Sequence, residues 1–111
     1  MKSVLIIGLG RFGMYMAKKF TELGNHVMAL DTDEEKINEI LPFVTSAQIG
    51  DGTKAAVLES IGIDNFDICV VCVGENFQSS LESTSLLKEA GAKFVLSRAS
   101  TEIQAKFLLR N

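Results

Sequence analysis

VLIIGLGRFG at residues 4–13 is the stretch that decides the fold of this chain. A short apolar strand runs into a Gly-x-Gly-x-x-Gly turn, and an amphipathic segment follows at once. In such a turn Gly8 permits the tight bend, Gly10 lets a pyrophosphate approach the backbone, and Gly13 lets the helix pack closely on the strand. The first amides of the helix then face an anion, with the positive end of the helix dipole behind them. The stretch therefore predicts a site for a dinucleotide or an adenine nucleotide.

Strand-like and helix-like segments alternate along the rest of the chain, which predicts an α/β fold. We expect a doubly wound, Rossmann-like parallel sheet of about five strands with helices on both faces. The predicted strands cover residues 3–8, 27–31, 44–49, 68–73 and 94–97. The predicted helices follow these strands, and the last of them contains Ile103 and Phe107. The inward faces of the first two helices are expected to hold Phe12, Met16, Phe20 and Leu23, and Ile37, Ile40 and Leu41.

Length and composition fit one globular domain. The chain has 111 residues, of which 47% are hydrophobic and 23% charged, and no apolar run has the length of a membrane span. A net charge of −3 argues against nucleic acid as the main partner, because phosphate backbones require clustered Lys and Arg. A strand that starts directly after Met1-Lys2-Ser3 leaves no room for a signal peptide, so we expect a cytoplasmic protein. A six-stranded doubly wound sheet needs one more strand, so residues 1–111 are expected to be the N-terminal part of a longer protein.

Ligands of open parallel sheets bind beyond the carboxyl ends of the strands, and this rule sorts the polar residues. His26 precedes a predicted strand, lies at the opposite rim and is a poor candidate for a general base. The sequence shows no catalytic triad, paired carboxylates or metal-binding cluster that would carry enzymatic chemistry. The residues expected at the ligand rim are Gly8, Gly10, Arg11, Phe12, Gly13, Asp31, Thr32, Asp51, Gly52, Gly74, Asn76 and Arg98.

Asp31 follows Gly13 by 18 residues, close to the spacing of about 20 that is typical of a ribose-binding acid. A carboxylate there accepts hydrogen bonds from the 2′- and 3′-hydroxyls of a ribose. It repels a 2′-phosphate, and no Arg at Thr32 or Asp33 tolerates one, so NAD is favoured over NADP. AMP, ADP and ATP carry the same free diol. The alternative role of Asp31 is to cap the following helix.

Two arginines and a second aspartate complete the predicted site. Arg11 starts the first helix, where its guanidinium can make a bidentate contact with phosphates; alternatively it is a solvated helix-start residue. Arg98 follows the fifth predicted strand and can assist from across the crevice. Asp51 can accept a hydrogen bond from an adenine amino group, or cap the helix after the turn at residues 50–53, and the two roles are compatible.

Cys69 and Cys72 form a Cys-x-x-Cys pattern, which raises the possibility of a redox sensor or a zinc site. They lie in a predicted buried strand, where residues three apart point to opposite faces. Such cysteines cannot bridge or share a metal, so we interpret them as small buried hydrophobic residues.

Residues 7–13, 30–33, 50–53 and 73–76 together resemble the N-terminal Rossmann lobe of the RCK/KTN (TrkA-N) domain family, cytosolic regulators of potassium channels and of Trk/Ktr-type potassium uptake systems. The resemblance covers essentially the whole chain. It implies a ligand-sensing regulatory subunit, not an enzyme, which binds NAD(H), ADP or ATP. It also implies a homodimer or larger ring of copies, held at the inner face of the membrane by a membrane-embedded potassium transporter subunit. By this likeness the glycines and Arg11 hold phosphates, Asp31 the ribose and Asp51 the adenine side.

The chain departs from the family pattern in two ways. Many relatives have a His early in the helix after the fifth strand, where this chain has Gln104 or a neighbour. The family's last strand, crossover helix and C-terminal lobe are not in the sequence, so no site on them is carried over. The alternative function is the cofactor-binding part of an NAD-dependent oxidoreductase, which Arg11 and the Gly-Asp-Gly-Thr turn at residues 50–53 disfavour.

Overall fold

The computed structural model describes residues 1–72 and 77–97. Gly74, Asn76 and Arg98, three of the predicted rim residues, lie outside the described residues. The predicted last helix, with Ile103 and Phe107, lies outside them as well.

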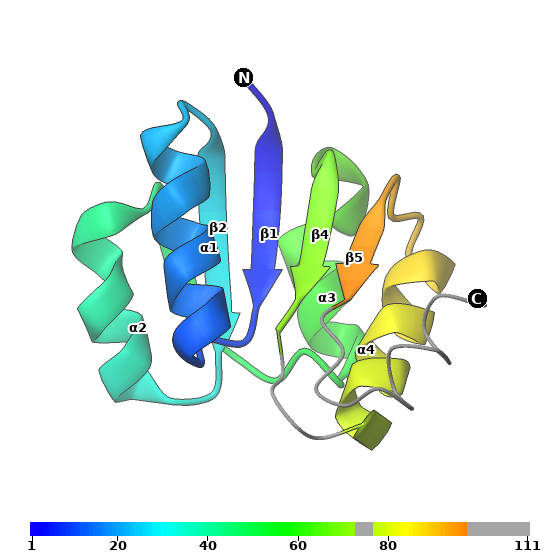
Figure 1. Ribbon diagram of the computed structural model, residues 1–111. Helices are drawn as coiled ribbons and strands as arrows, with labels where there is room; N and C mark the ends of the chain where they lie inside the picture. Colours follow the sequence, from blue (N-terminus) through cyan, green and yellow to red (C-terminus); the bar gives the residue numbers. More distant parts are fainter. Residues whose placement is uncertain (73–76, 98–111) are drawn as a thin grey trace.

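The five described strands form one parallel sheet in the order β3-β2-β1-β4-β5 (Figure 1). From β1 the chain moves outward to β2 and β3, and then returns to place β4 on the other side of β1. This reversal is the switch point of a doubly wound fold, so the predicted fold class is confirmed. The strands are β1 (Ser3–Ile7), β2 (His26–Asp31), β3 (Ser46–Ile49), β4 (Ile68–Val71) and β5 (Val95–Ser97).

Helices cover both faces of the sheet, with α1 (Arg11–Glu22) and α2 (Glu34–Ile40) on one face and α3 (Ala55–Ile61) and α4 (Phe77–Glu89) on the other (Figure 1). Alternate residues of β1 supply the two cores. Val4 and Ile6 pack under α1 and α2, whereas Leu5 and Ile7 pack with Leu58 of α3. An apolar strand without polar alternation is what a two-sided parallel sheet requires.

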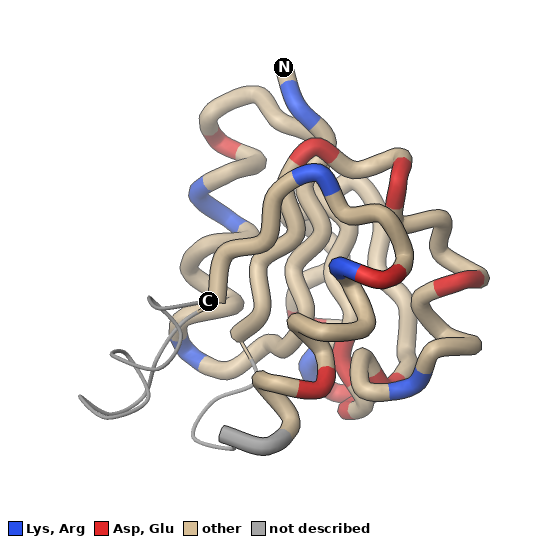
Figure 2. Tube along the Cα trace, turned by 90° about the vertical axis from the view of Figure 1, so that its right-hand side faces the viewer, with Lys and Arg blue, Asp and Glu red and all other residues tan. Residues whose placement is uncertain are grey.

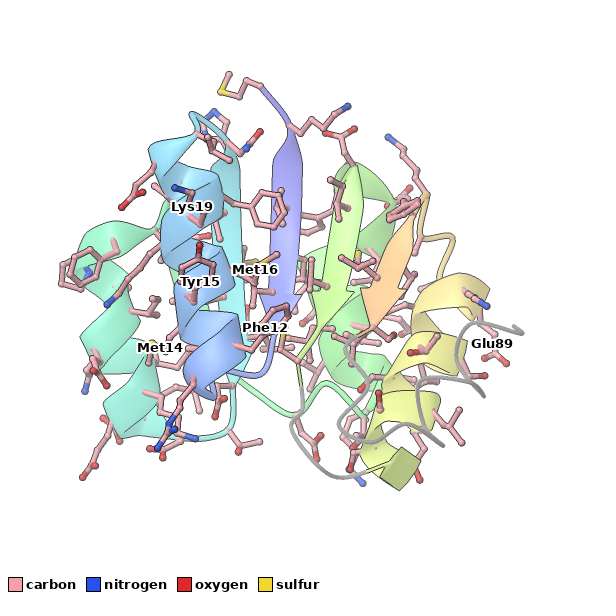
Figure 3. The ribbon with its side chains drawn as sticks, in the orientation of Figure 1. Phe12, Met14, Tyr15, Met16, Lys19 and Glu89 are labelled. Carbon is pink, nitrogen blue, oxygen red and sulfur yellow. The ribbon has the colours of Figure 1, made fainter. Side chains whose placement is uncertain are left out.

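The side chains of α1 divide between the core and solvent. Figure 3 shows Met14 on the α2 side of the helix, Phe12 and Met16 on the opposite side, and Tyr15 and Lys19 pointing outward. Phe12, Met14 and Met16 are partly buried against the core, as the helical spacing predicts for two of them.

The predicted inward positions of Leu23 and Leu41 are wrong. Leu23 is 67% exposed because α1 ends at Glu22, one residue earlier, and Leu23 is only its C-cap. Leu41 is 46% exposed because α2 ends at Ile40 and a short 3-10 turn (Leu41–Phe43) follows. Pro42 sits in the first turn of that segment, where its missing amide costs nothing, but it cannot continue an α-helix.

Cys69 and Cys72 belong to different cores, on opposite faces of the sheet, and both are buried thiols that form no disulfide. Burial raises the pKa of the Cys69 thiol to about 11, which keeps it protonated and unreactive. The prediction that they are separated structural residues is confirmed, and a shared disulfide or metal is excluded by their placement.

Charged residues of both signs are interspersed along the chain trace when it is viewed from the β5 side (Figure 2). Among the described helices, none combines the length and the apolar character needed to cross a membrane.

Candidate functional site

A cavity of about 330 Å³ lies at the carboxyl ends of β1 and β2, where doubly wound sheets bind their ligands. Its wall is formed by the ends of these two strands and by the turn that follows β3. Cys72, the residue directly after β4, also lines it. The volume is at the lower end of the range for small-molecule and cofactor sites, about 300–1,000 Å³. The predicted site residues in its lining are Gly8, Gly10, Asp31, Thr32, Asp51 and Gly52.

Three glycines in the turn after β1 have three different structural roles. Gly8 has a φ of 96°, which side chains disfavour, and its amide donates to the carbonyl of Leu30 at 2.8 Å. A Cβ on Gly13 would collide with the carbonyl oxygen of Gly8 and lie 3.3 Å from the Cβ of Cys72. A Cβ on Gly10 would meet nothing within 4 Å, and the Gly10 backbone has an ordinary φ of −69°. The tight bend predicted at Gly8 and the close packing predicted at Gly13 are confirmed. Neither backbone conformation nor packing requires a glycine at position 10, so the approach of a ligand is the remaining reason for one there.

The N-terminus of α1 adjoins this turn. Gly10 is the N-cap and has no side chain to cap the helix, and the first turn contains no acidic residue. The orphan amides of a helix start, together with the dipole, favour an anion. A phosphate group is therefore the chemistry that this end of the cavity suits.

Asp31, the last residue of β2, holds the glycine-rich turn in place. Its Oδ2 accepts a hydrogen bond from the amide of Leu9 at 2.6 Å, and its Oδ1 accepts one from the amide of Asp33 at 2.8 Å. The helix cap predicted as its alternative role belongs to Asp33, whose Oδ1 accepts from the amide of Glu35 at 2.9 Å. A carboxylate has about four acceptor positions, so Asp31 can still receive hydroxyls from the cavity.

Asp51 shapes the turn between β3 and α3. Its Oδ1 accepts from the hydroxyl of Thr53 at 2.6 Å and from the amide of the same residue at 2.8 Å. These hydrogen bonds, with a smaller contribution from the charge of Lys54, hold the pKa of Asp51 below its ordinary value of 3.8. Asp51 is therefore a carboxylate at neutral pH, able to accept but not to donate.

Three residues of the predicted site are described but do not line the cavity. Arg11 is exposed on the first turn of α1, Phe12 packs against the core under α1, and Gly13 is buried at the helix–strand contact. His26, the first residue of β2, lies at the opposite end of the sheet, as predicted.

The lining also contains residues that the sequence reasoning did not select. Those with polar, charged or sulfur-containing side chains are Lys36, Thr53, Cys72 and Ser79, and the others are Ile7, Leu9, Leu30 and Gly50. The sequence does contain a signal that could have identified Lys36 as a lining residue. It follows Asp31 by five residues and lies in the first turn of the helix that Asp33 caps. Asp31 and Asp51 are the acidic lining residues, and Lys36 is the one basic residue among the described lining. Across residues 1–72 and 77–97, no three His, Cys, Asp or Glu side chains gather as a possible metal site.

Comparisons with known proteins point to one family. The sequence pattern of the TrkA-N domain matches residues 4–111. The Ktr system potassium uptake protein C of Bacillus subtilis is 42% identical over 107 residues, which are 96% of this chain and 48% of that protein. The Ktr system potassium uptake protein A of Vibrio alginolyticus is 32% identical over 96% of this chain and 49% of that protein. The chain thus spans about half the length of these curated relatives.

Solved structures agree on the fold. The NAD(P)-binding domain of an exopolyphosphatase-related protein from Archaeoglobus fulgidus superposes with a TM-score of 0.84 at 19% identity, over 99% of this chain and 82% of that one. The Kef C-terminal domain of Shewanella denitrificans, in an AMP-bound form, gives a TM-score of 0.81 at 24% identity, over 97% and 65%. At these identities the likeness shows a Rossmann-like architecture and no more.

Proposed function

This chain belongs to the TrkA-N domain family, and from that membership we propose that it is the nucleotide-sensing N-terminal lobe of a regulatory subunit of a potassium uptake transporter. The relatives named as Ktr potassium uptake proteins support the role in potassium transport. The Rossmann-like neighbours, one of them bound to AMP, support nucleotide binding in general.

The ligand we propose is an adenine nucleotide, NAD(H), ADP or ATP. The supporting observation is the pairing of two features across one cavity: the start of α1 at Gly10, with no acidic residue in its first turn, and the carboxylate of Asp31. The first suits phosphate and the second a ribose diol. Asp51, on the turn after β3, is the proposed acceptor for the adenine amino group.

Sensing requires more than binding. A ligand shifts a conformational equilibrium only by its differential affinity for the two states. ATP, ADP and NAD(H) share adenosine and differ in what lies beyond it, so the discriminating residue must act at the phosphate end. Arg11, exposed on the first turn of α1, is the proposed discriminator.

The partners follow from the same family membership. We propose that copies of this subunit pair or form a larger ring in the cytoplasm, and that the assembly docks on a membrane-embedded potassium transporter subunit.

A regulator is a better interpretation than an enzyme. The neighbours among solved structures include a xanthine dehydrogenase, but at 16% identity and a TM-score of 0.76 it shares only the fold. The relatives at 32–42% identity are potassium uptake proteins.

The decisive experiment is titration calorimetry of ATP, ADP, AMP and NAD⁺ against the purified chain, together with mass spectrometry of any nucleotide that copurifies. We expect saturable binding of at least one adenosine-containing ligand, and competition among those that bind. Absence of binding by all of them would remove the proposed function. A nicotinamide requirement, with no binding of AMP or ADP, would favour the oxidoreductase instead.

A further inference from the structure

Four charged residues in a row open α2, and only the last of them lines the cavity. Asp33, Glu34 and Glu35 are exposed and lie outside the lining. Lys36 is half-buried and is part of it, beside Asp31 and Thr32. The sequence DEEK looks acidic at this point, but the charge it presents to the cavity is positive.

The geometry of α2 explains this orientation. Ile37 and Ile40 are buried and define the face of the helix that packs on the sheet. Lys36 precedes the first by one residue and the second by four, so it lies at the border of that face. Helical side chains lean toward the N-terminus of their helix, and the N-terminus of α2 is at the rim where β2 ends. The long stem of Lys36 therefore reaches back to the ribose end of the cavity.

Among the described residues, no carboxylate forms an ion pair with the ammonium of Lys36. Within the described part of the chain, the ion pair found is the exposed Lys19–Glu22 contact, so Lys36 is not paired with Asp31 or Asp51. The carboxylate of Asp31 instead accepts hydrogen bonds from the backbone amides of Leu9 and Asp33. The ribose end of the cavity thus has one carboxylate and one separate cation.

We propose that Lys36 reads the 2′ position of the adenosine ribose and allows the cavity to accept a 2′-phosphate, as in NADP(H) or adenosine 2′,5′-bisphosphate. The inference rests on the proposed nucleotide site and deepens it. Asp31 alone repels a 2′-phosphate, and in Rossmann folds that bind NADP a nearby Arg accommodates this group. A cation beside Asp31 would offset the repulsion by the same attraction. Lys36 supplies this charge from α2, whereas residues 32 and 33 directly after the acid do not.

The test uses ligand pairs that differ only in the 2′-phosphate: NAD⁺ against NADP⁺, and AMP against adenosine 2′,5′-bisphosphate. Dissociation constants are measured by calorimetry for the wild type and for Lys36→Gln, Lys36→Arg and Lys54→Gln. Lys54 is exposed, lies at the same rim just before α3 and is not in the lining, so its variant controls for the loss of one charge.

We expect the wild type to bind both members of each pair. Loss of one charge-assisted hydrogen bond in Lys36→Gln should weaken the 2′-phosphate ligands about tenfold or more, and the free-diol ligands less than about threefold. Lys36→Arg should keep the wild-type preference, and Lys54→Gln should weaken both members equally or not at all.

Two outcomes overturn the inference while leaving the nucleotide site intact: free-diol ligands bind but 2′-phosphate ligands do not bind the wild type, or Lys36→Gln weakens both members of a pair by the same factor. Failure of every ligand to bind the wild type instead removes the proposed function, and this inference with it. Circular dichroism of each variant confirms that the fold is retained.

Discussion

The amide of Leu9 donates a hydrogen bond of 2.6 Å to Oδ2 of Asp31, across 22 residues of sequence. The contact ties the glycine-rich turn after β1 to the end of β2. The carboxylate proposed to hold a ribose is therefore also the group that orients the turn proposed to hold phosphates. A ligand that changes the hydrogen bonds of Asp31 acts on both ends of the cavity at once.

Comparing two substitutions of Asp31 separates its role in orienting the turn from its proposed role in binding a ribose. Asp31→Ala removes the acceptor of the Leu9 amide and the proposed ribose acceptor, so we expect nucleotide binding to weaken by about 1–3 kcal/mol and the melting temperature to fall. Asp31→Asn keeps an oxygen for the amide of Leu9 but loses the charge, so it should lose affinity with a smaller loss of stability. Calorimetry and thermal melts measure the two effects. Unchanged affinity in both variants would remove Asp31 from the site.

Gly10 and Gly13 give a matched pair of alanine substitutions with opposite expected results. Gly13→Ala should destabilise the fold by about 3 kcal/mol or more, because its Cβ collides with the Gly8 carbonyl, which is backbone and cannot rotate away. Gly10→Ala should change the free energy of unfolding by less than about 1 kcal/mol, since its Cβ has open space and its φ is ordinary.

Only Gly10→Ala can then report on the ligand. We expect it to weaken nucleotide binding, because the added methyl group occupies the space through which a pyrophosphate approaches the backbone. Urea unfolding gives the stabilities and calorimetry the affinities. A fully stable Gly10→Ala variant with wild-type affinity would show that no phosphate rests against this turn.

The parts of the fold that were predictable from sequence are those fixed by local signals. The bend at Gly8 and the contact at Gly13 both depend on the absence of a Cβ. A glycine in the sequence shows that absence directly. The end of α3 at Gly62 is of the same kind, because Gly62 adopts a φ of 80°. Leu23 and Leu41 were misplaced because a helical period cannot say at which residue the helix ends.

The composition of the cavity was harder to predict, because it depends on where side chains lean in three dimensions. The rule for strand ends located Asp31, Thr32 and Asp51 correctly in the lining. It has no equivalent for helices, so it missed Lys36, which enters the cavity from the first turn of α2. Arg11 follows the same turn as Gly10, yet its side chain is exposed and outside the lining.

The bond from Thr53 to Asp51 predicts how stability responds to acid. The pKa of Asp51 is lowered in the folded chain, chiefly by the Thr53 hydroxyl, so its stabilising contribution is complete above the ordinary value of 3.8 and is lost as the pH falls through the folded value. Thr53→Val removes the hydroxyl and should raise the pKa of Asp51 toward that ordinary value. The variant should therefore be less stable than the wild type near neutral pH, and the difference should shrink in strong acid.

Carboxyl NMR titration and urea unfolding at several pH values test this prediction. Asp67 is the internal control, because its lowered pKa depends first on the backbone amide of Ser3, at the other end of the sheet. Its titration should be the same in the wild type and in Thr53→Val. If the pKa of Asp51 does not move in the variant, the hydroxyl is not the cause of the shift.

Arg11 gives the prediction that bears most directly on sensing. Arg11 is exposed in the first turn of α1 and lies outside the cavity lining, so we expect it to contact the part of a ligand that extends past the start of the helix. Arg11→Ala should therefore weaken ATP more than ADP, and ADP more than AMP, by up to about 1.5–3 kcal/mol for ATP, the value of a hydrogen bond to a charged group. Added salt should reduce the difference, because the contact is exposed.

Lys19→Ala, which removes an exposed cation from the far end of the same helix, should leave all three affinities unchanged. Equal losses of affinity for ATP, ADP and AMP in Arg11→Ala would mean that Arg11 does not discriminate nucleotides by their number of phosphates. That discrimination would then have to come from elsewhere in the protein.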